Sequence, residues 1–253
     1  MLTSLIRKTS CAATLCLVGL LAFDASAADV QFKGNHLKIK FDKSHPEFIQ
    51  VLGQDGFPGM IGVAVNDELV AIHTGVVHVS VKGSSLGDTL DIDQTVQLRG
   101  HLTIKMGAGD DEVTLSGLVT QNVKVSLGKG DDVLEDSEDW LFVGGSCTIK
   151  AGAGEDAVDF HQPTLVQGSM SIDLGKGLPD NEDLHLKVGP YEIVKTLSIR
   201  LSKKGDEDVV LEGVAAGKLI IRGGQGDNEV DLESGDNIFG EAIYKKIDEI
   251  LLP

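Results

Sequence analysis

Apolar and polar residues alternate along this chain in short rows that recur about every two dozen positions. From Leu102 to Met106 every second residue is apolar. Leu102, Ile104 and Met106 therefore share one face of a strand, and Thr103 and Lys105 lie on the other. Seven such rows begin at Val77, Leu102, Val123, Cys147, Met170, Leu197 and Leu219, and a degenerate eighth begins at Leu37. A period of two with many β-branched residues predicts strands rather than helices.

Each full row leads into a turn rich in glycine and acidic residues. The glycines nearest the acidic residues are Gly87, Gly109, Gly130, Gly154, Gly177, Gly205 and Gly226. A second short alternation follows the turn, as at Val113 and Leu115. No single strand here is long enough to bury its apolar face alone, so successive units must stack. The pattern predicts an all-β fold, a parallel β-helix (solenoid) of seven or eight coils with about 21–24 residues per coil.

Both ends of such a stack need cover, because unpaired strand edges are templates for aggregation. We expect residues 28–75 to form an N-terminal cap with a degenerate first coil, and residues 76–235 to form the β-helix repeats. Ile243, Ile247 and Ile250 fall on one face at helical spacing. Residues 236–253 are therefore predicted to form a C-terminal capping helix over the last coil.

The first 27 residues have the pattern of a secretory signal peptide. Arg7 and Lys8 precede an apolar run, Cys11 to Phe23, that is too short to span a bilayer. Ala25-Ser26-Ala27 provides a small-x-small cleavage site. We expect cleavage after Ala27 and a secreted or periplasmic protein without a membrane span.

Charge and cysteine content exclude several classes of partner and site. The chain has 39 Asp and Glu against 22 Lys and Arg, a net charge of −17, which argues against nucleic acid and anionic membranes. Beyond the signal peptide only Cys147 remains, so no internal disulfide is expected. Cys147 falls on the apolar face of its row and is predicted to be a buried hydrophobe. The seven His residues show no zinc-ligand spacing.

Four of the turns share a nine-residue pattern. They are MGAGDDEVT (106–114), LGKGDDVLE (127–135), AGAGEDAVD (151–159) and GGQGDNEVD (223–231). These segments resemble the calcium-binding nonapeptide of RTX, or haemolysin-type, proteins, G-G-x-G-x-D-x-U-x with U a large apolar residue. The resemblance implies that turn carbonyls and aspartate carboxylates hold calcium between stacked turns. The metal ligands it implies are Gly107, Gly109, Asp111, Gly128, Gly130, Asp132, Gly152, Gly154 and Asp156.

The turns also depart from the RTX pattern. RTX motifs run in tandem every nine residues, whereas here one occurs per coil. The first glycine is replaced by Met106, Leu127 and Ala151, and the turn that keeps it has Asn228 in place of the Asp. Stacked carboxylates about 5 Å apart would repel by about 0.8 kcal/mol per neighbour even at the dielectric of water. Two interpretations stay open: calcium sites, or a solvated acidic edge that keeps the rod monomeric.

A second, outward-facing column precedes the turns and includes Lys105, Ser126, Lys150, Asp173 and Arg222. Its cations are expected either to pair with the acidic turns or, by analogy at the level of the fold, to form the basic row of a carbohydrate lyase.

Three functions follow from these patterns. The first is a secreted, non-enzymatic structural or binding protein with calcium-assisted turns. The alternatives are a polysaccharide-active lyase or hydrolase on a β-helix, and an adhesin-like surface protein. Only 4% of residues are aromatic, which leaves few stacking platforms for sugars and favours the first. No catalytic or cofactor-binding residue is assigned. The expected partners are calcium, and carbohydrate or another surface protein.

Overall fold

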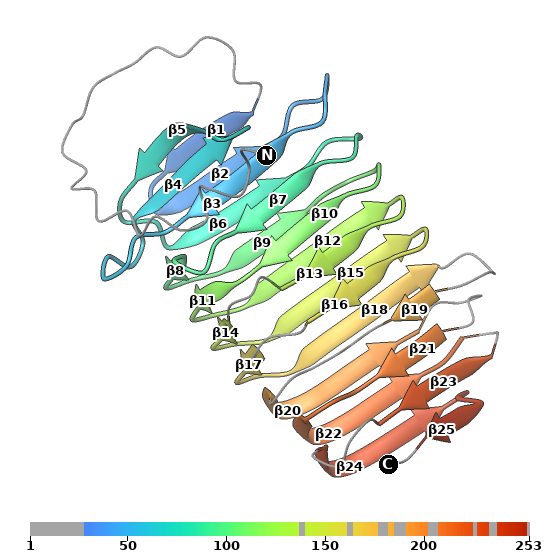
Figure 1. Ribbon diagram of the computed structural model, residues 1–253. Coiled ribbons are helices and arrows are strands. Elements are labelled where there is room, and N and C mark those ends of the chain that lie inside the picture. The colour runs from blue at the N-terminus through green and yellow to red at the C-terminus, as the bar shows by residue number, and fades with distance from the viewer. Residues whose placement is uncertain are drawn as a thin grey trace, which may run out of the picture.

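The computed structural model describes residues 28–136, 140–160, 164–176, 182–184, 191–201, 207–224, 227–232 and 237–251. Secondary structure in these residues is β throughout, with no helix, and parallel strands stack coil upon coil into a solenoid (Figure 1). The predicted all-β solenoid is therefore confirmed. The predicted signal peptide, residues 1–27, lies outside the described residues. No helix in the described part of the chain could cross a membrane.

One row of strands, here called the long stack, carries the first strand of every coil. Its members are β2 (His36–Lys40), β6 (His78–Lys82), β9 (Leu102–Lys105), β12 (Val123–Lys129), β15 (Cys147–Ala153), β18 (Met170–Lys176), β20 (Tyr191–Arg200), β22 (Val214–Arg222) and β24 (Ile238–Lys245). Neighbours pair in parallel with equivalent residues opposite one another, as Leu102 with Val123 and Val123 with Cys147. All eight rows predicted from the sequence are strands of this stack.

Two shorter rows complete each coil. The second strands are β3 (Phe48–Leu52), β7 (Thr89–Ile92), β10 (Glu112–Leu115), β13 (Val133–Glu135), β16 (Ala157–Asp159), β19 (Glu182–Leu184), β21 (Glu207–Val210), β23 (Asn228–Asp231) and β25 (Glu249–Leu251). The third strands are β8 (Gln97–Leu98), β11 (Gly117–Val119), β14 (Leu141–Val143) and β17 (Thr164–Val166). In the next coil the third strand and the following long-stack strand are one continuous strand, β20. Its residue Ile193 pairs with Val166 of β17, and its later residues pair with β18.

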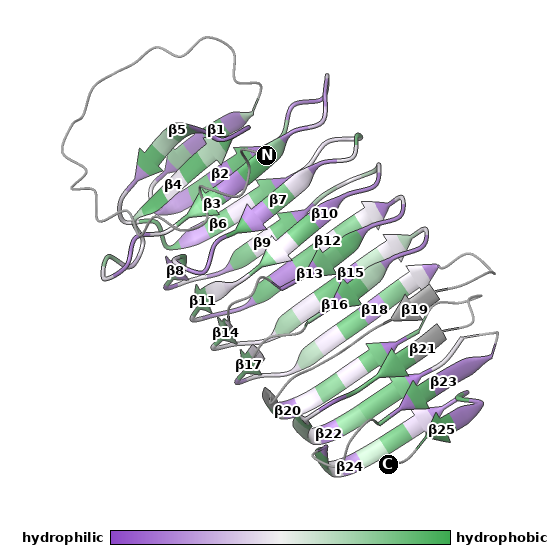
Figure 2. Cartoon of the chain, viewed as in Figure 1, coloured by the Kyte–Doolittle hydropathy of each residue, from purple (hydrophilic) through white to green (hydrophobic). Residues whose placement is uncertain are grey.

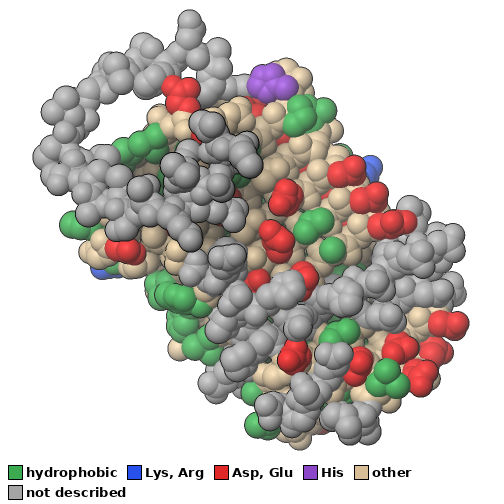
Figure 3. Space-filling model, viewed as in Figure 1, with side chains coloured by type: hydrophobic (Ala, Val, Ile, Leu, Met, Phe, Trp, Pro, Cys, Tyr) green, Lys and Arg blue, Asp and Glu red, His purple; other side chains and the backbone are tan. Residues whose placement is uncertain are grey.

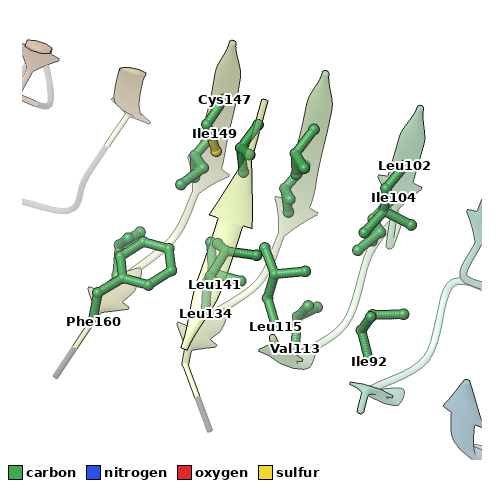
Figure 4. Close-up of a cluster of buried hydrophobic side chains, with 14 of the residues drawn as sticks. Ile92, Leu102, Ile104, Val113, Leu115, Leu134, Leu141, Cys147, Ile149 and Phe160 are labelled. Carbon is green, nitrogen blue, oxygen red and sulfur yellow. The ribbon is translucent and has the colours of Figure 1, made fainter. Parts of the chain in front are cut away.

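The core lies between these rows, and the alternation of the sequence places it there. Hydropathy alternates along the strands of the long stack (Figure 2). Leu102 and Ile104 point inward toward side chains of the second strands, including Val113 and Leu115 (Figure 4). Cys147 is fully buried as predicted, and burial raises the pKa of its thiol to about 12. Such a thiol carries no thiolate at neutral pH and acts only as packing.

Antiparallel strands cover the N-terminal end. β1 (Asp29–Lys33) pairs antiparallel with β2 and closes the outer edge of the long stack. β4 (Ile61–Val65) and β5 (Glu68–His73) form a hairpin that continues outward from β3. The first coil therefore does not present its parallel edges to water.

The predicted C-terminal capping helix over residues 236–253 is wrong. β24 pairs in parallel with β22, with Ala242 opposite Leu219, and β25 pairs with β23. Lys246, with φ 56°, turns the chain between the two strands. Ile243 in β24, Ile247 in the turn and Ile250 in β25 have the spacing of one face of a helix, although none of them is helical. The strands also satisfy the backbone groups of β22 and β23, which a helix lying over the last coil would leave unpaired.

Candidate functional site

The turns after the long stack pack so closely that glycine is required at their crossing points. Gly128 has φ 134°, and a Cβ placed on it would lie 2.1 Å from the carbonyl oxygen of Gly107 in the coil before. Equivalent glycines stack in the same way at Gly152 and Gly175. Backbone therefore lies directly on backbone in these turns, and the residues that follow them are brought into register.

Immediately after the turns, buried aspartates join one coil to the next. We call Asp88, Asp111, Asp132 and Asp156 the aspartate ladder; each is at most 5% exposed. The backbone N–H of Asp88 donates to Oδ1 of Asp111 at 2.8 Å, and that of Asp111 donates to Oδ1 of Asp132 at 2.9 Å. The N–H of Asp132 donates to Oδ1 of Asp156 at 3.2 Å. Each rung satisfies a backbone donor that the turn would otherwise leave unpaired.

The same kind of hydrogen bond recurs near both ends of the described chain, at residues that the sequence pattern did not identify. The N–H of Glu47 donates to Oδ1 of Asp88 at 3.2 Å, and the N–H of Asn228 donates to Oδ2 of Asp248 at 3.0 Å. Each of these residues stands two positions before an apolar residue of a second strand, and in the inner coils that residue is buried, as are Leu90 after Asp88 and Val230 after Asn228. That offset, rather than the glycine spacing, is the signal that would have found them.

The middle of the ladder is electrostatically costly. Oδ2 of Asp111 and Oδ2 of Asp132 are buried and have no hydrogen-bond partner. Burial raises the pKa of Asp111 to about 7, and the neighbouring carboxylates of Asp132 and Asp88 add to the increase. Burial also raises the pKa of Asp132 to about 6, with Asp110 and Asp131 contributing. Hydrogen bonds from the backbone oppose both shifts without cancelling them.

An outer acidic column runs beside the ladder and consists of Asp110, Asp131 and Glu155, all exposed. Its hydrogen bonds run in the opposite sense: the N–H of Asp131 donates to Oδ1 of Asp110, and the N–H of Glu155 to Oδ1 of Asp131, each at 2.9 Å. Acidic side chains line the edge of the molecule where the turns lie (Figure 3). The solvated acidic edge expected from the sequence describes this outer column, but not the buried ladder.

The structure brings Asp111, Asp132 and Asp156 together in one ladder, close to the turns that carry the predicted carbonyl ligands. The carbonyl of Gly107 already accepts the N–H of Lys129 at 3.2 Å. Among the described residues, no three or more His, Cys, Asp or Glu side chains surround a common point at which a metal could sit. Any ion at a turn would therefore rely on one ladder carboxylate and backbone oxygens. The calcium ligands implied by the RTX resemblance stay a prediction.

Fold and site together define a parallel β-solenoid whose coils are joined, turn by turn, through buried carboxylates. Comparison with protein-family models, curated proteins and solved structures gives no match.

Proposed function

We propose that this chain is an exported, non-enzymatic structural or binding protein, a rod whose aspartate ladder takes up calcium. The observation that carries the proposal is the pair of buried, unpartnered carboxylate oxygens, Oδ2 of Asp111 and Oδ2 of Asp132. A buried charge without a partner is costly, and either a proton or a hard cation relieves that cost. The raised pKa values identify the proton as the competitor of the cation.

The donors at these turns suit calcium in kind. Calcium takes carboxylate and backbone carbonyl oxygens and tolerates irregular geometry, whereas magnesium demands an octahedron and keeps its waters. Asp111 with carbonyls of Gly107 and Gly109 would hold one ion, and Asp132 with carbonyls of Gly128 and Gly130 a second. Bound calcium would neutralise the buried carboxylates of the ladder.

Melting curves in calcium, in magnesium and in sodium chloride of matched ionic strength test the proposal. At a hundred times its dissociation constant one site adds about 2.7 kcal/mol. For a domain of this size, that gain corresponds to a rise in melting temperature of about 5–10 °C. Magnesium should give a smaller rise, and sodium chloride less still.

Two matched variants locate the effect. Asp132→Asn removes a ladder carboxylate and should abolish much of the calcium gain. Asp131→Asn removes the same charge from the exposed outer column of the same turn and should keep most of it. Equal stabilisation by calcium and by sodium chloride of matched ionic strength would refute the calcium proposal. The ladder would then only join neighbouring coils through its hydrogen bonds.

A further inference from the structure

Positive charge gathers on the outward face of the long stack in a chain whose net charge is −17. One outward position of every strand lies in register with the next along the whole stack. In order, these positions hold Lys40, Lys82, Lys105, Ser126, Lys150, Asp173, Arg200, Arg222 and Lys245. The sequence predicted the outward orientation of the middle of this column, and the structure confirms it and extends it to both ends.

Most of these cations are not neutralised by the chain itself. Arg200 pairs with Asp173 at 3.2 Å. Within the residues that the structure describes, no carboxylate comes within ion-pair distance of Lys40, Lys82 or Lys105. Like charges directly opposite one another on adjacent strands destabilise a sheet. The expected pairing of Lys105 with an acidic turn is therefore absent, and a column of three lysines about 4.8 Å apart is left to attract anions.

The same face is hollowed at its N-terminal end. One hollow, of about 480 Å³, is lined by His36, His78, His101 and Lys124 among others. A second, of about 380 Å³, is lined by residues that include Lys40, Lys82 and Lys105, together with one carboxylate, that of Asp29. Ser80 and Thr103 line both, so the two hollows adjoin and form one groove across β2, β6, β9 and β12.

The histidines along this groove are held in place by backbone donors. The N–H of His101 donates to Nδ1 of His78 at 3.1 Å, and the N–H of Asn122 donates to Nδ1 of His101 at 3.2 Å. The rings of His78 and His101 stack with centroids 5.3 Å apart. Because Nδ1 accepts a hydrogen bond, the neutral ring carries its proton on Nε2 and can donate from there. The histidines thus form one column of the groove and Lys82 and Lys105 another, with Ser80 and Thr103 between them.

We infer that this groove binds a linear acidic polysaccharide, a polymer of uronic acid residues laid across strands β2 to β12. Such a polymer presents regularly spaced carboxylates, which match the lysine column, and hydroxyl groups, which match Ser80, Thr103 and the imidazoles. A nucleic acid fits less well, because the lining contains no Trp, Tyr or Phe on which a base could stack, and the rings of His78 and His101 already stack on each other. This site lies apart from the aspartate ladder and does not depend on calcium.

Isothermal titration calorimetry of the full chain with oligogalacturonate of defined length tests the inference. Low ionic strength favours the charge contacts, and EDTA removes calcium, so a failed calcium proposal would not affect the outcome. Binding should weaken as sodium chloride is added. A neutral glucan of equal length should give no measurable heat.

The double variant Lys82→Ala/Lys105→Ala should bind oligogalacturonate about tenfold more weakly, since two exposed charge contacts are lost. The matched control is Lys129→Ala/Lys176→Ala, which removes two exposed lysines from the ends of β12 and β18, outside the groove. Melting curves of both variants establish that they are folded. The inference is overturned if wild type does not bind, if both variants lose affinity equally, or if a single-stranded oligonucleotide of equal charge binds more tightly.

Discussion

Asp111 and Asp132 show how strongly one position in the coil determines the behaviour of a side chain. Asp110 and Asp131, one residue earlier in each turn, are exposed. The ladder residues are at most 2% exposed and have pKa values of about 7 and about 6. Two adjacent carboxylates of one turn therefore differ in burial, and burial raises the pKa of the inner one.

This difference predicts how stability changes with pH in the absence of calcium. Between about pH 4 and pH 7 the folded chain holds protons on Asp111 and Asp132 that the unfolded chain, with ordinary aspartate pKa values near 3.9, has released. The free energy of unfolding contributed by these two groups should therefore fall as pH rises through this window. Urea denaturation in EDTA at several values from pH 5 to pH 8 measures it.

Variants separate this contribution from that of the remaining carboxylates. Asp132→Asn mimics the protonated side chain, so it should flatten the pH profile and stabilise the calcium-free protein at pH 8. Asp131→Asn should leave the slope of wild type. A wild-type stability that rises steadily from pH 5 to pH 8 would contradict the buried, unpaired state of the ladder.

At the scale of the strand and turn, the sequence predicted the features that depend on local pattern. Eight of the nine strands of the long stack were found because alternation fixes which side chains point inward, and the turns at Gly109, Gly130 and Gly154 were found by their glycines. The predicted turns at Gly177, Gly205 and Gly226 lie outside the described residues. The ladder was found only in part. Asp88, Asp248 and Glu47 lack the full glycine pattern, and their position before a second strand becomes informative only once the register is known.

Neither the groove nor the C-terminal strands could be predicted from the sequence, because both depend on contacts between residues that are far apart in the chain. His36, His78 and His101 are far apart in sequence and meet only because coils of unequal length keep the long stack in register. At the C-terminus the spacing of the isoleucines predicts a helix, but the chain forms strand β24 on the free edge of β22. The strand is favoured because it satisfies the backbone hydrogen-bonding groups of that edge.

The stacked turns make a prediction about glycine that separates conformation from crowding. Gly34, in the β1–β2 hairpin, has φ 67° with no neighbouring atom near its missing Cβ, so Gly34→Ala should cost about 1–2 kcal/mol of strain. Gly128→Ala adds a backbone clash to an unfavourable φ and should cost clearly more. Urea denaturation of the two variants compares them, and equal losses would argue against close stacking of the turns.

At the scale of the whole molecule, export is proposed from the first 27 residues and can be tested directly. The small-x-small site before Ala28 predicts that a bacterial host with a general secretion pathway releases a chain beginning at Ala28. Intact-mass measurement of protein from the periplasm or medium gives the N-terminus. A chain found only in the cytoplasm with residues 1–27 still attached would refute the proposed localisation.

The antiparallel strands at the N-terminal end also bear on the order in which the chain folds. Synthesis delivers the N-terminus first, so the coil whose outer edge is covered by β1 is also the earliest to emerge. Every later coil then meets a finished neighbour whose free edge guides its pairing, and needs contacts only about one coil back along the chain. Coils can thus fold one after another from the N-terminus to the C-terminus. At each step a single free strand edge is available for pairing, so strands have few opportunities to pair out of order.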